Sequence, residues 1–204
     1  MKTSIGCSGI YFPEWKNKFY PEGLSKNIWF EYYCEHFNTL ESNITFYRFP
    51  KFEFLQNCYK KSPSKFLFSV KAPRLLTHYK KFSGSERLLL DFYKSIHYGL
   101  KEKLDCVLFQ MPSQLVYDEN KLSQIIKSLD TLFLYVIEFR HESWWNEKVY
   151  NELGKNKISF CSVSHPKLPD EVIKNNSVMY FRFHGVPKLY VSEYKKNYLK
   201  QIAD

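Results

Sequence analysis

The sequence lacks the cysteine pattern of a disulfide-stapled or zinc-binding protein. Its five cysteines are odd in number and lie far apart, and no two of them form a Cys-x-x-Cys pair. This spacing argues against both a disulfide framework and a cysteine zinc site. Cys7, Cys106 and Cys161 fall inside apolar runs. We therefore expect these three to be small core residues.

Long apolar runs and glycine-rich phosphate loops are also missing. No apolar run approaches the ~20 residues that cross a membrane, and no basic segment followed by an apolar one opens the chain. We therefore expect a cytoplasmic protein with no membrane partner. Gly6 and Gly9 do not complete a dinucleotide-binding fingerprint. They predict either a tight turn or room for a ligand to approach the backbone.

What the chain does have is many aromatic residues and an excess of positive charge. Aromatic residues make up 19% of its 204 residues, and we expect some of these rings to line a pocket. Tyr11, Trp15 and Tyr20 fit either stacking on a ligand ring or a hydrophobic plug. The formal charge of +9 makes this a basic protein, which attracts phosphates or nucleic acid. Because the lysines are spread along the chain, solvated helix faces explain them equally well.

Short apolar runs of β-forming residues alternate with stretches of helical periodicity, and no internal linker separates them. This alternation is typical of a parallel sheet wrapped by helices. Strands are predicted over residues 4–9, 39–47, 66–71, 106–112, 136–140, 158–163 and 178–185. Helices are predicted over residues 27–36, 50–61, 85–98, 119–129 and 146–156, and in the C-terminal stretch where Tyr190, Tyr194 and Tyr198 lie four apart.

The sequence therefore predicts a single α/β domain over residues 1–204, a TIM-barrel-like (β/α) barrel. Seven strands are visible and the eighth is apparently missing, because no apolar run after Gly185 supplies it. A sheet edge left open in this way is a place where a second copy of the chain pairs. A homo-oligomer formed through this edge is therefore one expectation.

One stretch begins with the apolar pattern of a buried strand and then reaches charged residues. It is Val136-Ile-Glu-Phe-Arg-His-Glu-Ser-Trp-Trp145. Strand alternation places Glu138 and Arg140 on one face and Phe139 on the other. Folding alone has no reason to collect an acid, an arginine and His141 at the end of a strand. We therefore predict an active site at this strand's end.

Further motifs follow the same order as those of a known family. They are Ile5-Gly-Cys-Ser-Gly9 with Trp15 and Phe19-Tyr-Pro21; His36-Phe-Asn-Thr-Leu-Glu41 with Asn43-Ile-Thr-Phe-Tyr47; Phe68-Ser-Val-Lys71 with Thr77-His78; Val107-Leu-Phe-Gln-Met-Pro112; Glu138-Phe-Arg-His141 with Ser143-Trp144; and Tyr180-Phe-Arg-Phe-His-Gly185. Together they resemble the domain-of-unknown-function 72 family, also called YecE-like, over essentially the whole chain. The resemblance implies a TIM-barrel-like fold but assigns no activity, because the role of the family is unknown.

The resemblance also implies a last strand, with a Tyr-Phe-Asn-Asn-like segment, that this chain does not contain. The chain is therefore interpreted as a family member shortened at its C-terminus. Three consequences stay open at this point. The barrel is open, or another chain fills the gap, or the shortened protein has lost its activity.

In barrels of this type the active site lies at the C-terminal ends of the strands. We predict Glu138 and His184 as the catalytic acid and base. The predicted substrate-binding residues are Ser8, Glu41, Asn43, Tyr47, Lys71, Gln110, Arg140, His141 and Arg182. Among these, the two arginines and Lys71 suit an anion. The set predicts an enzyme that acts on a phosphorylated or otherwise anionic small molecule, with its cofactor unidentified.

Several alternatives explain the same residues. A structural ion network of Glu138 with Arg182 or Lys71 is one of them. Glu41, Glu138 and His184 suit a divalent metal ion, although no close ligand spacing supports it and no metal is predicted. Lys71 suits a Schiff base. A nucleic-acid-binding module without catalysis and an inactive remnant are the other function classes, and the first predicts affinity that falls steeply with salt.

Overall fold

The computed structural model describes residues 3–130 and 132–203. The chain divides into two compact units, and each is described by itself. The first unit comprises Met1–Lys80 and Gly84–Leu108. The second comprises Lys81–Ser83 and Phe109–Asp204.

The first unit holds parallel strands that pair with their neighbours in sequence. Gly6 lies opposite Thr39, which in turn lies opposite Leu67. The strands are β1 (Gly6–Cys7), β2 (Thr39–Ser42), β3 (Leu67–Lys71) and most of β4 (Leu104–Gln110). The helices are α1 (Trp29–His36), α2 (Ile44–Tyr47), α3 (Phe52–Lys61) and α4 (Glu86–Leu100), with short 3-10 helices at Pro13–Trp15, Lys26–Ile28 and Lys101–Lys103 and a π-helix at Leu75–Tyr79.

The hydroxyl of Tyr33 joins helix α1 to the sheet of the first unit. Tyr33 of α1 accepts a hydrogen bond from the Cys7 amide at 2.7 Å and donates one to the Thr39 carbonyl at 2.8 Å. This hydroxyl therefore ties α1 to both β1 and β2.

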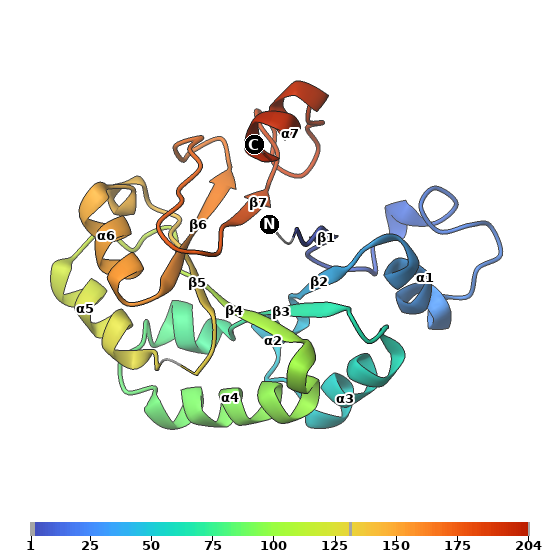
Figure 1. The fold of residues 1–204 in the computed structure, drawn as a ribbon, viewed down its shortest axis with the longest axis horizontal. Coiled ribbons are helices and arrows are strands. Elements are labelled where there is room, and N and C mark those ends of the chain that lie inside the picture. Colours follow the sequence, from blue (N-terminus) through green and yellow to red (C-terminus); the bar gives the residue numbers. More distant parts are fainter. Residues whose placement is uncertain (1–2, 131, 204) are drawn as a thin grey trace. The chain divides into compact units, whose positions relative to one another are not determined.

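Helices α3 and α4 lie side by side (Figure 1). A Cβ atom at Gly99 would lie 2.5 Å from the Leu55 Cβ, so glycine is what lets these two helices approach.

The second unit continues the same pattern with the end of β4 and three more strands. The Met111 amide donates to the Glu138 carbonyl at 2.8 Å and so joins the end of β4 to β5. The elements are β5 (Tyr135–Glu138), β6 (Ile158–Ser164), β7 (Tyr180–Phe183), α5 (Glu119–Ser128), α6 (Glu147–Lys155), α7 (Lys196–Ala203) and a 3-10 helix at Glu142–Trp144. Asn146 caps α6, because its Oδ1 accepts from the Val149 amide at 3.1 Å.

The strand order follows the chain order from β1 to β7. Parallel strands in this succession, separated by helices, form an α/β fold of the TIM-barrel-like type, as the sequence predicts. The longest helix described is α4, with 15 residues. Within residues 3–130 and 132–203, no helix is long and apolar enough to cross a membrane.

The strand predicted over residues 39–47 is wrong in its second half. β2 ends at Ser42, and the chain turns into α2 at Ile44. Thr45 explains the turn, because its hydroxyl lies 2.9 Å from the Ser42 carbonyl and 2.6 Å from the Lys71 carbonyl, where β3 ends. Asn43 and Tyr47 therefore leave the strand and lie in the loop and helix that follow it.

The C-terminal helix is shorter than the tyrosine spacing predicts. It begins at Lys196, so Tyr190 and Tyr194 lie outside it. Tyr190 has a left-handed backbone with φ of 63°, and its amide donates to the His184 carbonyl at 2.6 Å. The Tyr194 hydroxyl accepts from the Gly185 amide at 2.6 Å. Both tyrosines thus hold the loop after β7 in place, and their spacing does not reflect a helix.

The cysteines are free thiols. Cys106 and Cys161 are buried, as predicted, and Cys106 donates to the Ser69 hydroxyl at 3.3 Å. Cys7, also predicted to be a core residue, is half-buried. It lies in β1, a strand of two residues of which neither is buried.

Candidate functional site

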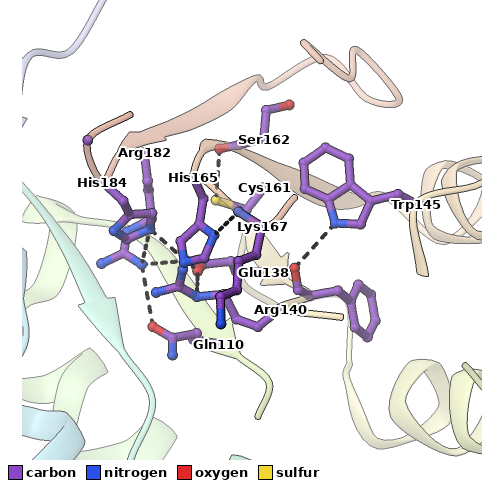
Figure 2. Close-up of polar contacts among 12 residues, drawn as sticks. Gln110, Glu138, Arg140, Trp145, Cys161, Ser162, His165, Lys167, Arg182 and His184 are labelled. Carbon is purple, nitrogen blue, oxygen red and sulfur yellow. Dashed lines mark hydrogen bonds and ion pairs between the residues drawn. The ribbon is translucent and has the colours of Figure 1, made fainter. Parts of the chain in front are cut away.

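Charged and titratable side chains converge at the C-terminal ends of β5 and β7 in the second unit (Figure 2). Glu138 is the last residue of β5 and is fully buried. Arg182 lies in β7 with 9% of its surface exposed, and His184 follows β7 with 5% exposed. Arg140 follows β5 and Gln110 ends β4. We call these five residues the Glu138 cluster.

The Glu138 carboxylate holds both arginines of the cluster. Arg140 Nε lies 2.5 Å from Glu138 Oε1, and Arg182 Nη1 donates to Glu138 Oε2. His184 Nε2 lies 3.6 Å from Glu138 Oε1, beyond ordinary hydrogen-bond length but close enough for an electrostatic interaction. Arg182 Nη1 also lies 3.5 Å from Gln110 Oε1. Two guanidinium groups thus face one carboxylate, and the cluster carries excess positive charge.

The charge of Glu138 follows from these contacts. Burial alone would raise the pKa of this carboxyl, but the Arg182 guanidinium, His184 and Arg140 together hold the pKa well below its ordinary value of 4.5. The group is therefore an anion at neutral pH and a weak proton acceptor. It is well suited to orienting the two guanidinium groups.

Two imidazoles lie beside this carboxylate. Burial lowers the pKa of His184, although its contact with Glu138 acts in the opposite direction. The pKa of His165 falls to about 4, chiefly through burial and then through Arg140 and His184. The two rings meet edge to face with centroids 5.9 Å apart. Both are neutral at pH 7. His165 Nδ1 accepts a hydrogen bond from the Lys167 amide at 3.1 Å, so the unprotonated nitrogen of this ring is already engaged.

The sequence analysis did not select His165. This residue follows β6 directly, since β6 ends at Ser164. The rule that found Glu138 and His184, polar residues at strand ends, also applies to it. The predicted strand ends at Val163, one residue short of the observed end, and this places His165 in a connecting loop.

The Glu138 cluster contains an unsatisfied donor. Arg140 Nη1 is buried without a hydrogen-bond partner among the residues that the structure describes. A buried polar group left in this state costs about 1–3 kcal/mol. An oxygen of a phosphate or carboxylate would satisfy this donor and offset the excess positive charge.

His141 lies in a different contact. Its Nδ1 lies 2.9 Å from the Ser143 hydroxyl and accepts from the Ser143 amide at 3.2 Å. It thereby caps the 3-10 helix Glu142–Trp144. Trp144, the last residue of this helix, stacks on Phe139 with the two ring centroids 4.0 Å apart. This packing fixes the chain direction after β5.

The remaining predicted residues belong to the first unit. Ser8, Glu41, Asn43 and Tyr47 line one cavity of about 420 Å³. Lys71 ends β3, is 8% exposed, and has its Nζ 4.2 Å from the centre of the Phe46 ring. Four of the predicted substrate-binding residues therefore line one cavity in the first unit, and Gln110, Arg140 and Arg182 belong to the Glu138 cluster in the second, whereas Lys71 and His141 lie in neither group.

Over the two described ranges, no three His, Cys, Asp or Glu side chains gather closely enough to hold a metal ion. The neutral imidazoles of His165 and His184 are adjacent, and the nearby carboxylate of Glu138 is already engaged by two arginines. The chemistry that this arrangement offers is anion binding and proton transfer.

Comparisons with known proteins agree with this fold. The family model described as "Protein of unknown function DUF72" matches residues 4–204. A DUF72 family protein from Thermotoga maritima MSB8 has 28% sequence identity and a TM-score of 0.86, over 98% of this chain and 84% of that one. Two structures of a DUF72 family protein from Enterococcus faecalis V583 share 19% identity, with TM-scores of 0.72 and 0.68, over 85% and 84% of this chain and 78% and 69% of theirs. A comparison with curated proteins found no match. The chain belongs to the DUF72 family, whose function is unknown.

Proposed function

We propose that this protein is an enzyme that acts on a phosphorylated or otherwise anionic small molecule at the Glu138 cluster. The observation that carries the proposal is the buried Arg140 Nη1 donor, which has no partner in the described part of the chain. It lies in a cluster where two guanidinium groups face one carboxylate. An anionic oxygen supplies the missing acceptor for Arg140 Nη1.

In this proposal the two arginines bind the anion and Glu138 positions them. The carboxylate fixes both guanidinium groups before the ligand arrives, which reduces the entropy lost on binding. His184 accepts the proton, because its lowered pKa keeps the imidazole neutral at pH 7. Glu138, which the sequence analysis named as an acid or base, becomes a positioning residue because its own pKa is so low. Gln110, in contact with Arg182, orients the ligand.

Other expectations from the sequence stay proposals of the same kind. They are substrate contacts by Lys71 and His141, a cytoplasmic location, a single domain over residues 1–204, and pairing with a second copy at a sheet edge. The free thiols support the cytoplasmic location, because reducing compartments keep cysteines unpaired.

Native mass spectrometry of the protein purified from cells is the first test of the proposed enzyme. We expect a bound anionic metabolite in the wild type and its loss in Arg140→Lys, since lysine keeps the charge and loses the planar fork. The matched control is Arg87→Lys, at an arginine whose side chain is 82% exposed. The control should retain the metabolite. Bound oligonucleotides of mixed length would instead favour a nucleic-acid-binding module.

A second experiment tests the proton-transfer role with the metabolite so identified. The His184→Asn variant should bind the metabolite with unchanged affinity and lose turnover. Asparagine fills a similar space but cannot accept a proton as imidazole does. Equal turnover in wild type and His184→Asn would refute the role of this imidazole. Turnover that is lost together with binding would place His184 among the binding residues.

A further inference from the structure

We propose that the first unit carries a second binding site, for a neutral, ring-bearing small molecule with a hydrogen-bond donor. The site is the cavity of about 420 Å³, which we call the Asn43 cavity. It lies where the segments after β1 and β2 meet helices α1 and α3. This volume is within the roughly 300–1,000 Å³ of small-molecule pockets. The proposal is independent of the function proposed for the Glu138 cluster.

Aromatic side chains give the Asn43 cavity rigid walls. Tyr11, which lines it, stacks at 6.2 Å on Trp29. Trp29 is held in turn by Tyr20, with the two rings 4.1 Å apart and nearly parallel. Other apolar lining residues are Phe12, Phe30, Leu40, Phe54 and Phe68. A wall of stacked rings suits the flat face of a ligand ring.

Asn43 supplies the polar end of the cavity. Its Nδ2 donates to the Ser8 carbonyl at 2.7 Å, and this contact fixes the orientation of the amide. The Oδ1 atom is buried and accepts no hydrogen bond from any residue that the structure describes. A ligand hydroxyl or N–H group is the complement of such an acceptor. The ligand is therefore expected to carry a donor beside its ring.

The charges around the Asn43 cavity favour a neutral ligand. Lys61 lines the cavity, but its Nζ lies 2.6 Å from Glu31 Oε1 and is thereby neutralised. Glu41 is the carboxylate on the cavity wall. Most of the remaining lining residues are apolar, so a charged ligand would lose its hydration in the cavity at a cost in free energy. A neutral ring avoids this cost.

The composition of the lining distinguishes the Asn43 cavity from a packing defect. Protein interiors are close-packed, and voids much larger than a water molecule are few. A gap between a helix and a sheet is lined by apolar atoms alone. This cavity also includes Ser8, Glu41, Asn43 and Tyr47, the residues that the sequence selects as ligand-facing because they follow the ends of strands.

Two fluorescent naphthalenes test the ligand class on the wild-type protein. 2-Naphthol has a ring and a hydroxyl donor, and 2-methoxynaphthalene has the ring and no donor. Isothermal titration calorimetry should give one site for 2-naphthol and about fivefold weaker binding of 2-methoxynaphthalene, the effect of one hydrogen bond. Equal affinities would overturn the donor requirement. No binding of either compound would overturn the site.

Two cysteines provide a matched pair of variants for locating the site. Cys58 lines the Asn43 cavity, whereas Cys34 does not, and both are half-buried on neighbouring helices. Cys58→Phe should fill the cavity and weaken 2-naphthol binding at least tenfold, while Cys34→Phe should leave it unchanged. Circular dichroism confirms that each variant is folded. Unchanged affinity in folded Cys58→Phe would overturn the proposal.

Thiol protection locates the same site without any substitution. Bound 2-naphthol should slow the alkylation of Cys58 by iodoacetamide and leave that of Cys34 unchanged, as read by peptide mass spectrometry. Equal alkylation rates with and without 2-naphthol would overturn the proposal. Phosphate affinity should be the same in the wild type and in Cys58→Phe, so a failure here is distinguishable from a failure at the Glu138 cluster.

Discussion

Replacing Glu138 with glutamine removes one charge and keeps the shape of the side chain. The substitution leaves the Arg140 and Arg182 guanidinium groups buried without their carboxylate. Removing one partner of a buried ion pair costs about 3–5 kcal/mol. Glutamine keeps one acceptor oxygen, so we expect the free energy of unfolding to fall by about 3 kcal/mol, the lower end of that range. For a chain of this size the loss lowers Tm by roughly 6–12 °C.

The pH dependence of this loss has a definite sign. The folded pKa of Glu138 lies below its ordinary value of 4.5. The unfolded state therefore binds more protons in acid, and the stability that Glu138 contributes is complete above that value and lost as the pH falls towards the folded pKa. The difference between wild type and Glu138→Gln should be constant from neutral pH down to roughly 5.5 and should shrink in stronger acid.

Urea unfolding followed by circular dichroism at pH 7.5 and pH 4 measures both effects. The control is Glu152→Gln, at an exposed carboxylate that pairs with Lys155 at 2.7 Å on α6. Such a pair contributes about 0–1 kcal/mol. A loss for Glu138→Gln as small as that of the control, or one that grows as the pH falls, would refute the account of the buried carboxylate.

His184 and Asn146 each carry a further prediction. Sulfate, which unlike phosphate stays a dianion between pH 8 and pH 5, should bind more tightly as the pH is lowered from neutrality, because His184 has a lowered pKa and gains a positive charge only in acid; calorimetric titrations over that range check this, and His184→Asn should flatten the profile. Asn146→Ala should destabilise the protein by about 1 kcal/mol through loss of the α6 N-cap; an unchanged urea midpoint would show that the cap contributes nothing.

Much of the fold is visible in the sequence because helices and strands bury their residues with different periods. The apolar runs and helical spacings locate β3 to β7 and α3 to α6 within a few residues. The errors fall where tertiary contacts decide the local structure. Thr45 turns the chain after Ser42 by contacting the end of β3. Tyr194 contacts Gly185, and no helical period encodes that contact.

The candidate site is predictable to the same degree. Residues two apart on a strand share a face, so Arg182 and His184 were expected together, as were Glu138 and Arg140. Which strand ends meet, and at what distance, depends on register between strands and is not written in a local pattern. The lowered pKa values depend on burial by residues far away in the chain. The sequence therefore indicated the members of the Glu138 cluster but not that Glu138 would hold both arginines.

Anion binding by the Glu138 cluster through Arg140 is measured by isothermal titration calorimetry of inorganic phosphate at pH 7. Arg140→Lys and the exposed control Arg87→Lys are measured beside the wild type. We expect one saturable site in the wild type and in Arg87→Lys, and affinity at least tenfold weaker in Arg140→Lys. Equal affinities in all three proteins, or no saturable binding to the wild type, would contradict it.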